Sequence, residues 1–312
     1  MHIKTPIFLV GAERSGTTLL RLMLDHHPQI AFHHEFEFAV DQIDDKGNFP
    51  KLEDYYDYLA YHRIFLSSQL TIDHQLDYPA LVNNFLQQKQ LQANKPMIGA
   101  TIHHHFDKLI LIWPQAKFIH LIRDGRDVAR SNIVMGWAGN MFTGTDRWIE
   151  AEKLWQKLSD QLLPEQQITI YYEQLIQDSK ATLLKICQFI GVEFDEKIYD
   201  YAKQSTYELP DPKILERWRR FKPIDLQLAE SKIADLLIRW HYPLSGLPIL
   251  PITPQLRWRM YLHNRWQGIL FRIKRYSISL YAQDVLSRRL GFKNWQKQVR
   301  IRLNECDKKF LK

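Results

Sequence analysis

The spacing of apolar residues near the start of the chain predicts a buried strand that leads into a helix. Ile7–Val10 are four consecutive apolar residues, the pattern of a strand covered on both faces. Over residues 19–24 apolar side chains recur three and four positions apart, which places them on one face of a helix. Residues 11–18 lie between the two and contain two glycines. We therefore expect a strand, a tight loop and a helix in direct succession.

Further along the chain, the same patterns predict four more strands and a block of helices. The strands are expected over residues 28–32, 98–102, 117–122 and 168–175. Residues 51–96 contain no glycine and are rich in Leu, Tyr and Gln, and they predict a helical cap of two or three helices. Strands that alternate with helices indicate an α/β fold, which we expect to be a three-layer sandwich with a central parallel sheet flanked by helices.

Composition narrows the class of protein. The chain has 312 residues, of which 45% are hydrophobic, enough for one large α/β domain or two small ones. Its two cysteines, Cys187 and Cys306, lie far apart without CxxC spacing, so they indicate a reducing compartment rather than disulfides or zinc. No run approaches about 18 apolar residues and no apolar signal segment opens the chain. We therefore expect a cytoplasmic protein with neither a membrane span nor a signal peptide.

Charge divides the chain into two parts. The net charge is +7, but residues 251–312 carry 15 Lys and Arg against 3 Asp and Glu, while residues 1–250 carry 27 against 32. We interpret residues 1–250 as the main domain, with the helical cap inside it, and residues 251–312 as a basic helical C-terminal extension. No nucleic-acid partner is expected.

The extension has an amphipathic pattern. If the chain is helical from Pro254 onward, a row of apolar residues falls on one face: Trp258, Leu262, Trp266, Ile269, Leu270 and Ile273. Arg265 and Arg272 flank this row. The pattern fits a helix that lies peripherally on an anionic membrane, and it equally fits packing on the main domain or self-association.

The loop after the first strand has the spacing of a phosphate-binding loop. Gly11 and Gly16 stand five positions apart, as in the GxxxxGK[ST] loop whose backbone N–H groups surround phosphate oxygens. Thr17 replaces the lysine of that motif, and Arg14 supplies a cation earlier in the loop. A phosphoryl group in transfer carries two or more negative charges and needs that lysine and Mg²⁺, whereas a sulfuryl group carries at most one. The loop therefore favours a 5′-phosphosulfate, unless it is only a glycine-rich connection.

Two further positions carry chemistry at the ends of predicted strands. Arg123 ends the strand over residues 117–122, and Ser131 lies about one turn into the next helix, so both can hold one anion at a second phosphate site, separate from the first. Glu35 follows the second strand and, beside the phosphate-binding loop, is a candidate general base; without that loop a solvated loop carboxylate would be an equally good interpretation. A nucleotide with phosphates at both its 5′ and 3′ positions would need two such sites.

Together these motifs resemble the sulfotransferases that use 3′-phosphoadenosine 5′-phosphosulfate (PAPS), and most closely the branch that contains the tyrosylprotein sulfotransferases. Four segments carry the resemblance: residues 11–35, 123–131, 168–175 and 216–220. The similarity extends over roughly residues 6 to 245 and implies a P-loop-type fold. It also implies in-line transfer of a sulfuryl group from PAPS to an acceptor hydroxyl.

The resemblance assigns roles to individual residues. Glu35 would act as the general base, and Arg14 would stabilise the charge that develops on the transferred group. The residues implied in donor binding are Arg14, Ser15, Gly16, Thr17, Thr18, Arg123, Ser131, Tyr172 and Arg217. No metal is implied, and the acceptor is left open between a glycan, a lipid and a peptide tyrosine.

One departure from the family and two competing functions stay open at this stage. Thr101 stands where the family often carries a lysine that assists the bridging oxygen, so His103, His105 or Lys95 would replace it, or Arg14 would act alone. A P-loop kinase or NTPase is disfavoured by the missing loop lysine. A non-catalytic, membrane-associated member of the fold is disfavoured by the presence of Glu35 and Arg14.

Overall fold

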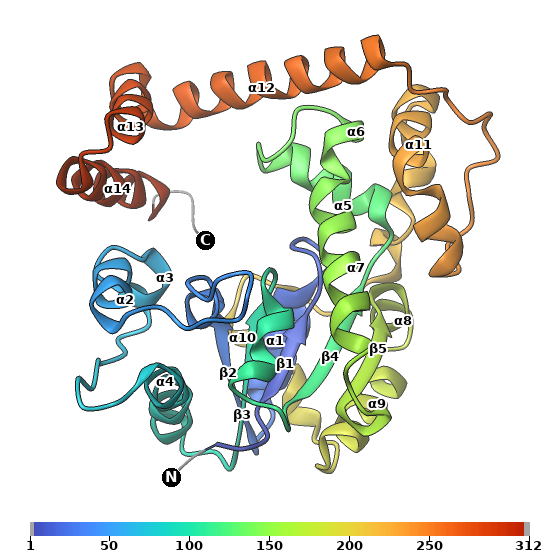
Figure 1. The fold of residues 1–312 in the computed structure, drawn as a ribbon. Helices are drawn as coiled ribbons and strands as arrows, with labels where there is room; N and C mark the ends of the chain where they lie inside the picture. The colour runs from blue at the N-terminus through green and yellow to red at the C-terminus, as the bar shows by residue number, and fades with distance from the viewer. Residues whose placement is uncertain (1–2, 309–312) are drawn as a thin grey trace.

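The computed structural model describes residues 3–308 and has an α/β fold (Figure 1). Five parallel strands form one sheet in the order β2-β3-β1-β4-β5, so the first strand of the chain lies at its centre. The strands are β1 (Ile7–Val10), β2 (Ile30–Glu35), β3 (Met97–Ile102), β4 (Lys117–Ile122) and β5 (Gln167–Tyr171). The predicted α/β fold with a central parallel sheet is confirmed.

Helices cover both faces of the sheet. The side chains of β1 accordingly alternate between two core clusters. Ile7 and Leu9 pack in one cluster, and Phe8 and Val10 pack in the other. The helices on the side of Ile7 are α1 (Thr17–His26), α8 (Tyr172–Gln177), α9 (Ser179–Ile190) and α10 (Tyr201–Gln204). Those on the side of Phe8 are α4 (Tyr78–Ala93) and α7 (Asp146–Ser159).

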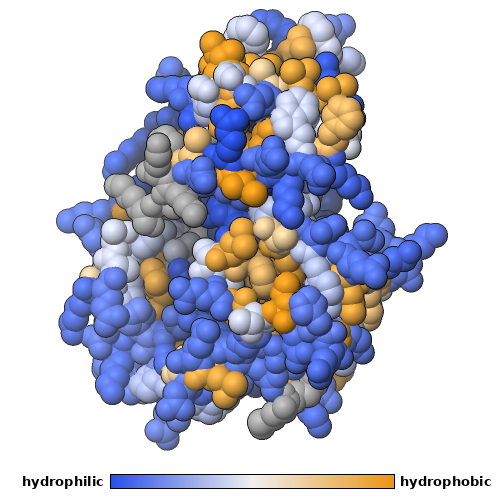
Figure 2. All heavy atoms as spheres, turned by 90° about the vertical axis from the view of Figure 1, so that its left-hand side faces the viewer, coloured by the Kyte–Doolittle hydropathy of each residue, from blue (hydrophilic) through white to orange (hydrophobic). Residues whose placement is uncertain are grey.

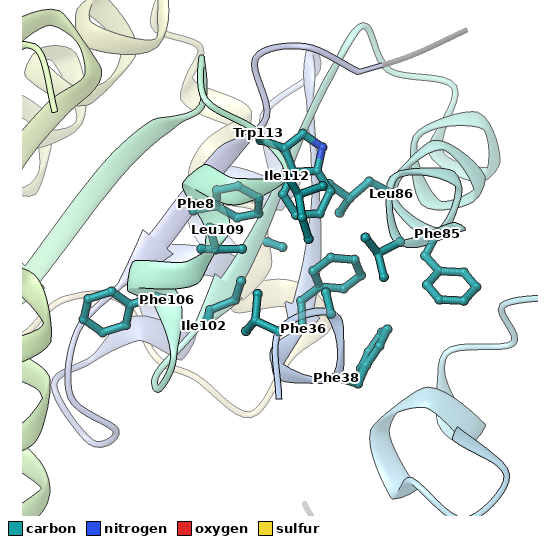
Figure 3. Close-up of a cluster of buried hydrophobic side chains, with 14 of the residues drawn as sticks. Phe8, Phe36, Phe38, Phe85, Leu86, Ile102, Phe106, Leu109, Ile112 and Trp113 are labelled. Carbon is teal, nitrogen blue, oxygen red and sulfur yellow. The ribbon is translucent and has the colours of Figure 1, made fainter. Parts of the chain in front are cut away.

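The larger core cluster is aromatic. Figure 3 shows Phe8, Phe36, Phe38 and Trp113 within it, beside apolar side chains of α4 and β3. The ring of Phe8 lies 5.2 Å from that of Trp113, and the ring of Phe36 lies 4.8 Å from that of Phe38. Because Phe36 and Phe38 directly follow β2, this packing fixes the end of the strand that carries Glu35.

Three further groups of helices complete the fold. The helical cap consists of α2 (Leu52–Leu59), α3 (Arg63–Ser67) and α4, in agreement with the two or three helices expected over residues 51–96. Beyond the end of β4, α5 (Gly125–Val134), α6 (Met141–Gly144) and α11 (Pro223–Arg239) pack together. Short 3₁₀ helices are η1 (Glu37–Ala39), η2 (Phe106–Leu111), η3 (Pro164–Gln166), η4 (Glu196–Tyr199), η5 (Pro212–Ile214) and η6 (Arg217–Arg220).

The C-terminal extension is helical, as expected. Its helices are α12 (Pro254–Tyr276), α13 (Ile278–Leu290) and α14 (Lys293–Lys308). In Figure 1 α12 runs across the top of the molecule, and α13 and α14 turn back towards the cap. Leu280, Val299 and Leu303 form a small core of their own between α13 and α14. The division of the chain into domains near residue 250 stays a prediction.

Two predicted strand boundaries are wrong. The second strand runs over Ile30–Glu35 rather than residues 28–32, because its pairing with β3 continues past a register shift until Glu35 lies beside Thr101. Glu35 is therefore the last residue of β2 rather than a loop residue. The fifth strand ends at Tyr171, and Tyr172 opens α8, so the predicted strand over residues 168–175 changes into a helix halfway.

Among the described residues, no helix combines the length and the apolar character that crossing a bilayer requires. The expected cytoplasmic location stays a prediction.

Candidate active site

The loop after β1 adopts a backbone conformation that requires glycine at both ends. Gly11 has a φ of 144° and Gly16 a φ of 96°, both in the range that side chains disfavour. A Cβ atom added to Gly11 would lie 2.4 Å from the carbonyl oxygen of Leu121, and one added to Gly16 would lie 2.3 Å from the ring of Tyr172. The two glycines thus let the loop pass closely between β4 and Tyr172.

The loop delivers the N-terminus of α1 to the carboxyl edge of the sheet. Gly16 is the N-cap, and no side chain among the described residues caps the helix. Thr17 and Thr18 occupy the first turn, where backbone N–H groups and the helix dipole favour an anion. The Ser15 hydroxyl is buried and has no hydrogen-bond partner within the described part of the chain. These groups fit a phosphate or sulfate ester.

Arg123 and Ser131 come together with the loop at the same edge. Arg14 Nε donates a hydrogen bond to Ser131 Oγ over 2.9 Å, and an Arg123 N–H donates to the Arg14 carbonyl oxygen over 3.2 Å. That the two sites hold separate phosphates stays a prediction, but the structure places the residues of the two sites in direct contact. The reason is that Arg14 has a φ of 71°, in the left-handed region, and its side chain reaches across to α5.

Tyr172 packs against both parts of the site. The Arg123 guanidinium lies 4.5 Å from the centre of its ring, and Gly16 lies under the same ring. Burial raises the pKa of Tyr172, and the charges of Arg123 and Arg217 act against that shift. The Nε of Arg123 is buried and has no partner among the residues that the structure describes, so this guanidinium has a donor available for an anion.

One cavity beside the loop has the size and lining for a nucleotide. It has a volume of about 290 Å³, and its lining includes Gly16, Thr18, Arg123 and Tyr172. Arg14, Thr17, Leu19 and Ile176 line it as well. A segment that the sequence analysis missed supplies the rest: Tyr207, Glu208, Leu209, Pro210, Asp211 and Ile214. Three of the residues predicted to bind the donor nucleotide lie close by but outside this lining: Ser15, Ser131 and Arg217.

A second cavity lies on the other side of the loop. Its volume is about 690 Å³, and it shares Arg14, Thr17 and Thr18 with the first. The side chain of Glu35, at the end of β2, lines this cavity. It is 47% exposed, and one of its carboxylate oxygens lies 3.9 Å from the Arg63 guanidinium. We call this second cavity the acceptor cleft. Residues of the phosphate loop therefore border both cavities, one of which contains the predicted base and the other the nucleotide-sized space.

The cap and the C-terminal extension form the walls of the acceptor cleft. From the cap come Tyr58, Tyr61, His62 and Arg63, and from the extension come Arg272, Tyr276, Arg288, Arg300 and Asn304. Asn304 donates a hydrogen bond to the Tyr61 carbonyl oxygen over 3.2 Å, which joins α14 to the cap. The sequence predicted the helical cap, but no local signal linked residues 272–304 to the acceptor cleft.

His103 and Glu37 also line this cleft, and a hydrogen bond joins them. His103 donates its backbone N–H to a Glu37 carboxylate oxygen over 3.0 Å, and its ring Nδ1 lies 3.0 Å from the Gly11 carbonyl oxygen. Because a carbonyl only accepts, Nδ1 carries a proton and Nε2 is left for another partner. Burial, reinforced by the nearby charge of Glu35, raises the pKa of Glu37 well above its ordinary value. Burial therefore favours the protonated, uncharged form of Glu37.

The structure distinguishes the three residues considered as replacements for the lysine missing at Thr101. Lys95 donates to the carbonyl oxygens of Asp25 and Ile30, at the opposite end of β2 from Glu35. His105 lies outside the lining of the acceptor cleft, whereas His103 lies within it. Of the three replacements considered, His103 lines the acceptor cleft together with Arg14, and Lys95 and His105 do not line it.

A buried arginine holds the elements behind the site together. Arg126 pairs with Asp124 at 2.6 Å and with Glu230 of α11 at 2.7 Å, and it donates to the Pro243 carbonyl oxygen at 2.8 Å. Its guanidinium also lies 3.5 Å from the ring centre of Trp218 in η6. This network fixes the start of α5, and with it Arg123, relative to η6 and α11.

The histidine-rich segments do not assemble a metal site in the part of the chain that the structure describes, residues 3–308. No group of three or more His, Cys, Asp or Glu side chains is placed there to hold an ion. His33 stacks on His34 with ring centres 4.7 Å apart. Burial, together with the charge of His34, lowers the pKa of His33 to about 3, so this ring is neutral.

Comparison with known proteins decides the family. A model of the sulfotransferase family matches residues 6–196, more than half of the chain. The chain belongs to the sulfotransferase family. The matched region contains the phosphate loop, Glu35, Arg123 and Ser131, and the predicted resemblance is confirmed at the level of the family.

The individual relatives of this sulfotransferase are distant. Over 275 residues it is 24% identical to protein-tyrosine sulfotransferase A of Caenorhabditis elegans, a match that covers 78% of this chain and 68% of the nematode protein. Over 244 residues it is 26% identical to an uncharacterized protein of Aquifex aeolicus, and there the match covers 70% of this chain but only 31% of the relative. The chain thus spans about a third of that second protein.

A solved structure supports the fold. The sulfotransferase domain of the Synechococcus PCC 7002 olefin synthase superposes with a TM-score of 0.52 and 20% sequence identity. The match covers 79% of this chain and 98% of that domain. At this identity the comparison establishes the shared α/β architecture.

Proposed function

We propose that this sulfotransferase moves the sulfuryl group of PAPS to an acceptor hydroxyl by in-line displacement. The observation that carries the proposal is that residues of the phosphate loop line both the nucleotide-sized cavity and the acceptor cleft with Glu35. A group held at Arg14 and Thr17 would be reachable from both sides, which in-line displacement requires.

Each charged end of PAPS has residues in the site that would bind it. The loop N–H groups, the Ser15 hydroxyl and Arg14 would hold the 5′-phosphosulfate, and Arg123 with Ser131 would hold the 3′-phosphate. Tyr172 would pack against the nucleotide and keep Arg123 in place, with Arg217 as a further cation nearby. The unpartnered Ser15 Oγ and Arg123 Nε are the features that support this fit most directly.

In the reaction, the acceptor oxygen would attack sulfur from the acceptor cleft while Glu35 takes the hydroxyl proton. The bond between sulfur and the bridging oxygen would break, and its electron pair would leave with the 5′-phosphate of adenosine 3′,5′-bisphosphate. Arg14 and the N-terminus of α1 would stabilise the negative charge on the bridging and equatorial oxygens. Proton removal by Glu35 would contribute roughly 10²- to 10⁴-fold in rate.

We propose further that His103 serves in place of the lysine missing at Thr101. Its Nδ1–H is held by the Gly11 carbonyl oxygen at the start of the phosphate loop, which directs the ring towards the transferred group. A protonated Nε2 would then donate to the bridging oxygen. His103→Ala should lower turnover while donor binding changes little, and His103→Lys should restore part of the rate.

Donor selectivity tests the proposal against a kinase or NTPase. Calorimetric titration with adenosine 3′,5′-bisphosphate in the presence of EDTA should give tight binding, and ATP under the same conditions should bind far more weakly. Tighter binding of ATP that depends on added Mg²⁺ would instead favour a phosphoryl-transfer enzyme. Transfer of label from ³⁵S-PAPS to glycan, lipid or peptide hydroxyls would identify the acceptor, and its absence from every acceptor would favour a non-catalytic member of the fold.

A further inference from the structure

The helix α12 has two opposite faces with different partners. One face holds the helix to the main domain: Asn264 accepts a hydrogen bond from the Gly139 backbone at 2.7 Å, and the Met260 carbonyl oxygen accepts one from Asn140 at 2.9 Å. Phe271 lies on the same face, so close to Gly136 that an added Cβ would meet its ring at 2.4 Å. Met260 and Tyr261 add apolar contacts to the cluster around Phe142, so the helix is attached through both polar and apolar side chains.

The opposite face is apolar and exposed. At 100° per residue the predicted apolar row is centred about half a turn away from Asn264 and Phe271. Trp258 is 65% exposed, Trp266 60% and Leu262 45%, and none of the 23 residues of α12, all within the described range, is buried. Packing on the main domain, one of the uses considered for this row, is therefore not what covers these three side chains.

The charge around α12 indicates which kind of partner surface would bind its exposed apolar face. From His241 to Gln283 the chain has no Asp or Glu, and Arg259, Arg265 and Arg272 lie beside the apolar row on the helix. Arg257 and Arg275 fall on the attached side, where Arg275 pairs with Asp307 at 2.7 Å. A second copy would bring the same positive surface against itself, since a two-fold contact pairs like with like. An anionic surface with an apolar interior matches the cations, the tryptophans and Leu262, whereas nucleic acid offers no apolar interior to Leu262.

We propose that the outer face of α12 docks on an anionic lipid bilayer. Trp258 and Trp266 would enter the interface between headgroups and acyl chains, where indole rings are favoured, while the flanking arginines contact lipid phosphates. Figure 2 shows apolar side chains gathered at the top of the molecule, over the C-terminal helices, with hydrophilic residues around them. Since α12 to α14 also wall the acceptor cleft, docking would bring that cleft to the membrane surface.

Cosedimentation of the full chain with vesicles tests this proposal without donor or acceptor, so it is independent of the proposed function. The protein should pellet with phosphatidylcholine–phosphatidylserine vesicles, and added salt should release it, because each Lys or Arg near an anionic surface contributes about 1 kcal/mol that screening removes. Trp258→Ser combined with Trp266→Ser should weaken binding roughly tenfold or more, given the apolar area withdrawn. Arg259→Gln combined with Arg265→Gln should reduce both the affinity and its salt dependence.

Matched controls lie on α9, which is remote from α12 in Figure 1. Leu184 is 46% exposed there and Lys185 is exposed beside it, so Leu184→Ser and Lys185→Gln should bind vesicles like the wild type. Circular dichroism should show that all variants keep their helix content, since every substituted side chain is exposed. Failure of the wild type to bind, or equal binding by the α12 and α9 variants, would overturn the proposal. Self-association that only the α12 variants lose, without vesicle binding, would show that the face is a dimer interface and overturn it as well.

Discussion

The guanidinium of Arg14 donates a hydrogen bond to the hydroxyl of Ser131, and this contact joins the phosphate loop after β1 to the helix after β4. The two residues are 117 positions apart in the sequence. Arg14 also lines both cavities of the site, so Ser131 sets the position of a cation at the point where donor and acceptor would meet. In this account Ser131 acts on the 5′ end of the donor through Arg14 as well as on the 3′ end.

The first prediction follows from that contact. Arg14→Ala and Ser131→Ala should each weaken binding of adenosine 3′,5′-bisphosphate, and the double variant should lose less than the sum of the two, because the groups act together. A coupling energy of about 1 kcal/mol is expected for residues in direct contact. Titration calorimetry on the four proteins measures it. Strictly additive losses would show that the two residues bind the ligand independently.

Arg123 should distinguish nucleotides by their 3′-phosphate. Arg123→Ala should weaken binding of adenosine 3′,5′-bisphosphate roughly 10- to 100-fold, the effect of losing a charge-assisted hydrogen bond, and should change AMP binding much less. Arg130→Ala is the matched control, since Arg130 is an exposed arginine on the same helix. Equal losses for the two nucleotides would mean that Arg123 reads the 5′ end.

His33 should make the fold sensitive to acid. Its pKa is about 3 in the folded protein because the ring is buried, whereas it is about 6.5 when unfolded, so the unfolded chain binds the proton first as pH falls. Its contribution to stability is therefore complete above pH 6.5 and is lost as pH falls towards 3. Between pH 7 and pH 5 the free energy of unfolding should drop by about 2 kcal/mol from this residue alone. Denaturant unfolding of His33→Leu at both pH values should show a correspondingly smaller drop; an unchanged drop would contradict the assignment.

Arg126 should matter more for stability than for chemistry. Arg126→Leu would leave the carboxylates of Asp124 and Glu230 buried without their partner, and the expected loss is about 3–5 kcal/mol of unfolding free energy. Combining it with Asp124→Asn and Glu230→Gln should recover much of that loss, because the uncompensated charges are then gone. Urea unfolding of the single and the triple variant measures both losses of unfolding free energy. A loss under about 1 kcal/mol in the single variant would show that the network is not stabilising.

The sequence predicted those parts of the molecule whose signals are local. The buried strand Ile7–Val10, the loop with Gly11 and Gly16, and the strand Lys117–Ile122 all depend on neighbouring residues, and the structure has each of them. The strand end at Glu35 was predicted too early, because its pairing with Thr101 is a contact between distant segments.

The walls of the two cavities could not be predicted in this way. Tyr207 and Arg300 reach the site through loops and helices whose positions are set by tertiary packing, and neither belongs to a periodic pattern that points to a ligand. The same holds for the contact of Arg14 with Ser131, since spacing along the chain says nothing of how two loops meet. Sequence reasoning thus found the groups that belong to motifs and missed those that only the fold brings near.

The central claim is that Glu35 removes the acceptor proton during sulfuryl transfer, and one comparison tests it most directly. Incorporation of ³⁵S from PAPS into the acceptors of a cell extract should be measured for the wild type and for Glu35→Gln, with donor affinity determined on the same samples. The account predicts labelled acceptor with the wild type and a rate roughly two orders of magnitude or more lower with Glu35→Gln, at nearly unchanged affinity for adenosine 3′,5′-bisphosphate. Transfer by Glu35→Gln at the wild-type rate would contradict it.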